Sequence, residues 1–384
     1  MFIETQEQYK KEYYRSMLQT LGSLSKLFSE NSAPYLYYRV AENLFCKSFD
    51  ADNLSRSDIS ADASLGDTGF GLKTFLRGSG SKMEKVAEFN RASIDLRELS
   101  TSQQVQEIAR LRNERIETTR RIYGVRNMIY HCVTRTEGKM EVTETPMNLI
   151  DIASLAVSNA NGKSINFSDG LEEYSFNISK STLFKRFTVE NVLMEIPVEI
   201  VDDPFALLEK IFSSPEAKEE ISKLTVVSEE TYKECVFLPL YSTRRKGEDK
   251  EVPPKSGLNQ WNAGGRARSL GEVYVPIPAW IHLKFPDFFP ERDTVFTLEL
   301  PNKRVLNAKI CQDGGKALMT NPNEALGQWL LRDILHLEEG ELLTYKKLQD
   351  IGLDAIVVSK EEGVYKVDFA KIGSYDSFEE KYNS

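Results

Sequence analysis

The stretch KSGLNQWNAGGRARSLGEVYVPIP, residues 255–278, joins a polar, glycine-rich segment to a short strand of alternating character. Its first part carries amides, a tryptophan, paired glycines and two arginines, and both glycine and asparagine favour turns. Amides and arginines pair with base edges in the major groove, whereas lysines and backbone N–H groups hold phosphates. The composition therefore predicts an exposed arm that binds nucleic acid, although a solvated loop of a peptide- or carbohydrate-binding module has a similar composition.

Short strands and turn residues surround this arm on both sides. Such a density of short strands at near-regular spacing is typical of a small barrel or sandwich. We expect short helices to interrupt the strands at 280–285 and 325–335. The strand-like segments are 233–242, 271–278, 294–302, 305–313, 316–321, 340–350 and 354–373.

A second polar arm, QDGGKALMTNPNEALGQ at residues 312–328, again combines paired glycines with amides and a lysine. With the first arm, which we place at residues 244–270, it would clamp a duplex against one face of the barrel. Lys180, in the N-terminal half, is a further candidate for a phosphate contact. The candidate DNA-binding residues on the arms are Arg244, Arg245, Lys255, Asn259, Gln260, Trp261, Asn262, Arg266, Arg268, Lys316, Asn321 and Asn323.

Composition sets the broad class of protein. The chain has 384 residues, enough for about two domains. Its net charge is −9, yet Arg244–Lys316 carries 13 Lys and Arg against 9 Asp and Glu, a local excess compatible with DNA binding. Four scattered cysteines without CxxC spacing argue against a disulfide framework or a zinc site. The absence of a leader-like start, a long apolar run and a GxxxxGK[ST] loop predicts a cytoplasmic protein without membrane contact or ATP use.

Residues 238–290, with FTLELPN, AKICQDGGKALMTNPNEALGQWLLRDIL, LTY and IGLDAI, closely resemble the B3-like C-terminal DNA-binding domain of NgoFVII-type restriction endonucleases. The resemblance covers about residues 236–375. It implies a seven-stranded pseudobarrel that grips the major groove with an N-terminal and a C-terminal arm. Those arms correspond to the two polar segments described above.

The N-terminal half mixes helices and strands. Hydrophobic spacing predicts helices at 6–30, 34–49 and 102–123, strands at 70–75 and 85–90, and a hairpin at 127–144. We expect the arginines of the helix at 102–123 to lie on a solvated face, paired with glutamates of the same helix. The whole chain then reads as an α+β protein of two domains. These are an α/β nuclease-like domain of the PD-(D/E)XK type at 1–200 and a B3-like pseudobarrel at 233–384, separated by linker helices at 201–232.

The three histidines do not supply the nuclease signature of NgoFVII-type enzymes, a phospholipase-D-like HxK with a downstream Asp and Asn. His131 is not in an HxK context, His282 lies in the recognition domain and His336 falls at a helix end. We therefore expect all three to be packed or surface side chains rather than nucleophiles.

A PD-(D/E)XK nuclease binds Mg²⁺ with an Asp and a second carboxylate and places a Lys near the attacking water. Hard oxygen ligands suit Mg²⁺, and a nearby ammonium stabilises charge in the transition state. We expect a hairpin of strands 70–75 and 85–90 to bring Lys73 and Glu88 together, with Asp62 as the partner carboxylate. Asp58 is a further metal-ligand candidate, and Glu42 a catalytic one.

The motif departs from its usual form, because Gly71 stands where the acid two residues before Lys73 is expected, and Asn90 follows Glu88 at the lysine position. The acid is then either supplied from a neighbouring strand or the motif lies elsewhere. Asp169, Glu172 or Glu173, and Lys180 form an alternative set. 

Together these features favour a type II restriction endonuclease that cleaves both strands of double-stranded DNA with Mg²⁺. One active site per chain cuts one strand, so we expect a homodimer. The alternative is a non-catalytic, sequence-specific DNA-binding protein, or a specificity subunit of a restriction complex.

Overall fold

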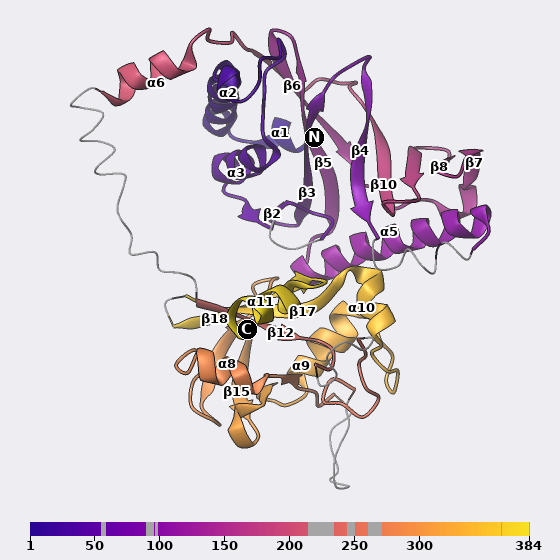
Figure 1. Cartoon of the computed structure of the whole chain (residues 1–384), viewed down its shortest axis with the longest axis vertical. Coiled ribbons are helices and arrows are strands. Elements are labelled where there is room, and N and C mark those ends of the chain that lie inside the picture. The colour runs from indigo at the N-terminus through magenta and orange to yellow at the C-terminus, as the bar shows by residue number, and fades with distance from the viewer. Residues whose placement is uncertain are drawn as a thin grey trace. The chain divides into compact units, whose positions relative to one another are not determined.

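The computed structural model describes residues 1–54, 59–89, 96, 99–213, 234–243, 250–259, 271–361 and 363–383 (Figure 1). These residues form two compact units. Apart from Ile59, the described residues up to Arg112 and from Val125 to Ser213 belong to the first unit. Asn113–Gly124 and the described residues from Glu234 onward belong to the second, so helix α5 (Thr101–Tyr123) contributes to both.

The first unit is built around a six-stranded sheet with helices on one face. Its strand order is β1-β2-β3-β5-β6-β11, and β3 and β5 are parallel neighbours whereas the other pairs are antiparallel. The strands are β1 (Asp52–Asn53), β2 (Ala63–Leu65), β3 (Thr68–Leu76), β5 (Asn127–Thr136), β6 (Lys139–Pro146) and β11 (Met194–Pro197); the helices are α1 (Phe2–Thr5), α2 (Gln8–Ser23) and α3 (Tyr38–Phe49).

Helix α3 shows why this face forms. Its apolar residues Ala41, Leu44, Phe45 and Phe49 recur at helical spacing, are buried, and share a core with Phe70 of β3. The helix stops at Asp50, whose left-handed conformation (φ 55°, ψ 38°) ends the regular hydrogen bonding.

A second, antiparallel sheet in this unit has the order β4-β10-β9-β8-β7. Val105, Ile108 and Leu111 of α5 share a core with its strands, as their helical spacing predicts. The strands are β4 (Ser81–Glu88), β7 (Ala156–Ala160), β8 (Ser164–Ser168), β9 (Glu173–Asn177) and β10 (Thr182–Thr188), and α6 (Pro204–Phe212) follows the last strand of the first sheet.

The expected hairpin between residues 70–75 and 85–90 is wrong. Both segments are strands, but β3 pairs with β2 and β5 in the first sheet, whereas β4 pairs with β10 in the second. Gly78 and Gly80, both with positive φ, redirect the chain between them. The sheets then meet through side chains, since the Phe75 and Phe187 rings lie 6.0 Å apart.

The second unit is a seven-stranded sheet of order β12-β17-β18-β14-β15-β16-β13 that nearly closes into a barrel, compatible with a B3-like pseudobarrel. β14 and β18 are parallel and the other pairs antiparallel. The strands are β12 (Glu234–Pro239), β13 (Val275–Pro276), β14 (Val295–Glu299), β15 (Val305–Cys311), β16 (Ala317–Thr320), β17 (Leu353–Glu361) and β18 (Val364–Lys371); the helices are α8 (Ala279–Lys284), α9 (Ala325–Gly327), α10 (Tyr345–Ile351) and α11 (Ser374–Asn383), with a π-helix at Gln328–Ile334.

Tyr123, in the half of α5 that belongs to this unit, donates a hydrogen bond to Asp368 of β18 at 2.9 Å. Burial raises the pKa of Asp368 to about 6. The hydrogen bond from Tyr123 stabilises the charged carboxylate and lowers the pKa, but its effect is smaller than that of burial. The folded state then binds the proton more tightly than the unfolded chain, so stability falls as pH rises from about 4 to about 6.

We therefore expect Asp368→Asn to remove this pH dependence. The pKa shift of Asp368 corresponds to about 3 kcal/mol in the free energy of unfolding. Residual solvent exposure of the side chain reduces this contribution to about 2 kcal/mol. Chemical denaturation of wild type and variant at pH 4.5 and 7.5 measures it. Equal pH dependence in the two proteins would contradict the assignment.

Candidate functional site

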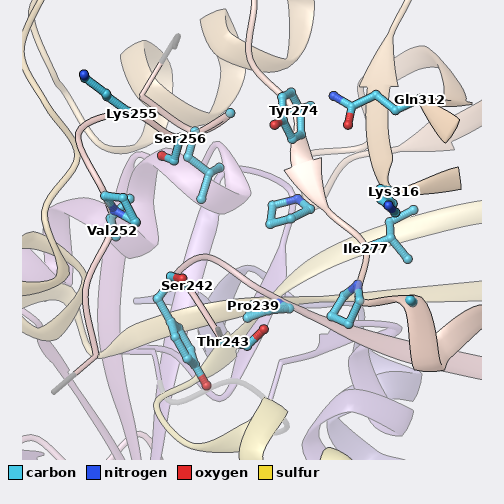
Figure 2. Close-up of a pocket in the computed structure, with 17 residues that line it drawn as sticks. Pro239, Ser242, Thr243, Val252, Lys255, Ser256, Tyr274, Ile277, Gln312 and Lys316 are labelled. Carbon is cyan, nitrogen blue, oxygen red and sulfur yellow. The ribbon is translucent and has the colours of Figure 1, made fainter. Parts of the chain in front are cut away.

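A pocket of about 440 Å³ lies where the two end strands of the seven-stranded sheet approach each other (Figure 2). We call it the seam pocket. Pro239 from the end of β12 and Pro276 from β13 line it, together with Pro278. Proline has no N–H to donate across a sheet, which accounts for incomplete closure at this point.

The seam pocket brings together the described bases of both expected arms. Lys255 lies on one side of it, and Gln312 and Lys316 lie on the other (Figure 2). Both lysines are exposed. Tyr241 and Tyr274 add aromatic surface to the wall. Cationic side chains around a partly apolar floor can attract a phosphate backbone and present flat surfaces to sugars or bases.

The base of the first arm packs closely on Tyr274. A Cβ at Gly257 would overlap the Tyr274 ring, and the Tyr274 N–H donates to the Gly257 carbonyl at 3.2 Å. The Asn259 side chain holds the arm in place through hydrogen bonds to the backbone. Its amide nitrogen donates to the carbonyls of Pro253 and Leu343, and its amide oxygen accepts from the Leu343 N–H. These contacts argue against the expected role of Asn259 in reading bases.

The other candidates of the arms have mixed outcomes. Asn321 is exposed, and Asn323 donates to Glu272 at 3.4 Å. Lys180 belongs to the first unit, on the exposed turn between β9 and β10. Arg244, Arg245, Gln260, Trp261, Asn262, Arg266 and Arg268 lie outside the described residues. Gln312 was missed, although its place at the start of the second arm and its amide were visible in the sequence.

A polar cluster around the buried Asp354 anchors the first arm to the barrel. Asp354 is fully buried and accepts hydrogen bonds from Tyr345 (2.9 Å) and Lys250 (3.2 Å). Lys250 also pairs with Asp376 at 2.6 Å, and Tyr241 donates to the same carboxylate at 2.7 Å. Burial raises the pKa of Asp354, an effect that the Lys250 charge opposes. Lys250 therefore ties the first arm to the barrel.

In the first unit, Glu42 lies within electrostatic range of both Asp62 and Lys73. Burial raises the pKa of Glu42, and the negative charge of Asp62 raises it further, whereas Lys73 opposes the shift. Asp62 precedes β2, and its Oδ2 accepts from the Leu72 N–H at 2.7 Å, which fixes the carboxylate beside β3. Glu42 also pairs with Arg39 at 2.8 Å.

Gly71 has a packing explanation. A Cβ at this position would lie 2.7 Å from Met147 Cε and 2.8 Å from Tyr130 Cδ1. The space in which an acid two residues before Lys73 would stand is therefore filled by other side chains. Any second carboxylate near Lys73 has to come from another element.

Glu84 of β4 is such a carboxylate, and the sequence interpretation overlooked it. Burial raises the pKa of Glu84, while the charges of Lys82 and Lys73 lower it. The expected residue, Glu88, lies at the end of the same strand, opposite Thr182, and pairs with Lys85 at 3.1 Å. A β-bulge between Lys85 and Ala87 separates Glu84, opposite Lys185, from Glu88, opposite Thr182, so strand alternation counted from Glu88 gave no signal for Glu84.

No group of three or more His, Cys, Asp or Glu side chains within the described ranges is arranged to hold a metal ion. Asp58 lies outside those ranges. In the alternative metal-ligand set, the carboxylates already have partners in the protein. Asp169 accepts from the N–H groups of Leu171 and Glu172, and Glu172 pairs with Lys185 at 2.7 Å.

Two further expectations concern basic and imidazole side chains. Arg112 is not on a solvated face but buried, donating to Ser60 Oγ and Tyr130 OH at 2.7 Å. His131 is buried between Tyr14 OH and Glu144, at 2.9 Å from each. His282 contacts the Gly315 carbonyl at 2.8 Å.

Comparison with known proteins gives a match within the second unit. Residues 234–362 match the family model of the NgoFVII C-terminal B3-like DNA-binding domain. This match covers the strands of the nearly closed sheet except β18, and both sides of the seam pocket. No curated protein matches the chain. None of the helices in the described part of the chain has the length and apolar character needed to cross a bilayer.

Proposed function

We propose that this protein is a type II restriction endonuclease that binds double-stranded DNA through its second unit and cleaves it in its first. The match of residues 234–362 to a B3-like DNA-binding domain carries the proposal. The seam pocket supports it, because Lys255 and Lys316 place positive charge on both sides of one recess.

The first unit offers chemistry suited to phosphodiester hydrolysis. The Lys73 charge acts on the carboxyl groups of Glu42 and Glu84, and the Asp62 carboxylate accepts from the N–H of Leu72, the residue before Lys73. Mg²⁺ is commonly bound by one or two carboxylates, with waters and substrate phosphates completing its shell, so this donor set fits it. When bound, Mg²⁺ would polarise the phosphate and acidify a water. Lys73 would stabilise the negative charge that develops on the phosphate oxygens.

The order of elements also supports a nuclease of the PD-(D/E)XK type. Helix α3 with Glu42 precedes the antiparallel pair β2 and β3, and α5 then leads to β5, parallel to β3. The described residues of each chain hold one such cluster, so double-strand cleavage would use a homodimer or two successive engagements.

Digestion of a mapped plasmid with the purified chain and Mg²⁺, followed by sequencing of the ends, tests the proposal. We expect discrete fragments with a common sequence at or near each end, and no cleavage in EDTA. Specific binding without cleavage under any divalent ion would instead identify a non-catalytic DNA-binding protein or specificity subunit. One observation favours this second candidate: the described residues include no three-ligand metal group.

A further inference from the structure

Gln312 has a backbone conformation that side chains rarely adopt. Its φ is 68° and its ψ is 164°, a region almost restricted to glycine. Glycines with positive φ follow at 314 and 315 in the same loop. A glycine at 312 would relieve the strain, so the side chain that is present carries a stability cost.

The loop that holds Gln312 is pinned on several sides. The Gly315 N–H donates to the Gln312 carbonyl at 3.1 Å, and His282 contacts the Gly315 carbonyl at 2.8 Å. The Ile277 N–H donates to the Lys316 carbonyl at 2.9 Å, which joins the end of the loop to the segment after β13. These contacts preorganise the loop before any ligand arrives.

The Gln312 side chain is exposed and lines the seam pocket opposite Lys255 (Figure 2). Its amide offers one donor and one acceptor, the pattern that pairs with N7 and N6 of adenine in the major groove. Lys316, four residues later on the same side of the pocket, offers a point charge suited to a phosphate. Strain at a binding surface is retained where the side chain has a task.

We propose that Gln312 is a specificity-determining residue whose amide reads an adenine in the recognition sequence. The inference rests on the proposed DNA-binding function and assigns a base class to one position of the site. Lys316, in contrast, holds the backbone without regard to sequence.

The test uses the full chain and a library of duplex DNA with randomised positions, from which the wild-type preference is selected. Affinities are then measured at fixed salt for every single-base-pair variant of the selected site. Gln312→Gly and Gln312→Ala should each lose about 5- to 150-fold of discrimination at one A·T pair and keep the others. Lys316→Ala should weaken binding to all duplexes alike and lower the salt slope by about 1.

Thermal unfolding supplies a second readout, in which the same substitution should increase stability while it decreases base discrimination. Gln312→Gly should raise the melting temperature by about 2–4 °C while it lowers discrimination. His336→Gly is the matched control, since His336 also has a positive φ (51°) and does not line the pocket. It should raise the melting temperature without changing any base preference.

Unchanged preferences at every position in both Gln312 variants would overturn the inference while leaving the proposed function intact. A lower melting temperature for Gln312→Gly would also overturn it, because the conformation would then not be strained. If the wild type selects no sequence, the proposed function itself fails and this inference with it.

Discussion

Lys73→Ala is expected to abolish cleavage and to leave DNA binding unchanged. The Lys73 ammonium is the cation that acts electrostatically on both Glu42 and Glu84, and its removal takes away charge stabilisation in the transition state. Loss of one such group lowers the rate by about 10²–10³-fold. Single-turnover cleavage of the selected site, with anisotropy measurements of binding in Ca²⁺, separates the two effects.

Lys47→Ala is the matched control, an exposed lysine on α3 outside the cluster, and it should cleave like wild type. Glu84→Gln should lower the cleavage rate as well, since Glu84 takes the place that Gly71 cannot fill. If Lys73→Ala cleaves at the wild-type rate, the cluster around Glu42 and Asp62 is not the catalytic site.

Asp354→Ala is expected to destabilise the second unit more than any surface substitution. The change leaves the Lys250 ammonium and the Tyr345 hydroxyl without their buried acceptor. Removal of one partner from a buried charged pair typically costs about 3–5 kcal/mol. Calorimetry of the full chain, in which the two units can unfold separately, should show the loss in one transition only.

Asp376→Ala serves for comparison, because Asp376 also binds Lys250 but its side chain is 47% exposed. The cost there should be about 1 kcal/mol or less. Asp354→Ala should also weaken DNA binding, since the contact between Asp354 and Lys250 holds the first arm against the barrel. Similar melting temperatures for the two variants would show that burial of Asp354 does not govern the stability of this cluster.

The sequence predicted most of the local elements because periodicity is a local property. The strand at 70–75, the helix at 102–123 and the 127–144 hairpin are confirmed by β3, α5 and the β5–β6 pair. Pairing between strands was less accessible. The two strands around Gly78 and Gly80 looked like a hairpin, but they pair within separate sheets that pack through Phe75 and Phe187.

The candidate site was predicted in part for the same reason. Glu42, Asp62 and Lys73 were chosen from residue type and order; the charges of Asp62 and Lys73 both act on the pKa of Glu42, and their role as a catalytic site stays a prediction. Glu84 was overlooked because its approach to Lys73 depends on how the two sheets face each other. Gln312 was overlooked because a strained φ leaves no trace in composition. Asn259 was expected to contact bases because the sequence does not distinguish an asparagine that braces a loop from one that contacts DNA.

Helix α5 has a consequence for how such proteins diversify. Its C-terminal half supplies Tyr123 to Asp368 and places Arg121 on the Ile334 carbonyl at 2.7 Å, within the second unit. A gene fragment that begins at Glu234 would encode a barrel without these partners. Exchange of target specificity between related genes by a single recombination event near residue 230 would therefore yield poorly folded hybrids, and viable chimaeras must inherit residues 113–124 from the same parent as the barrel.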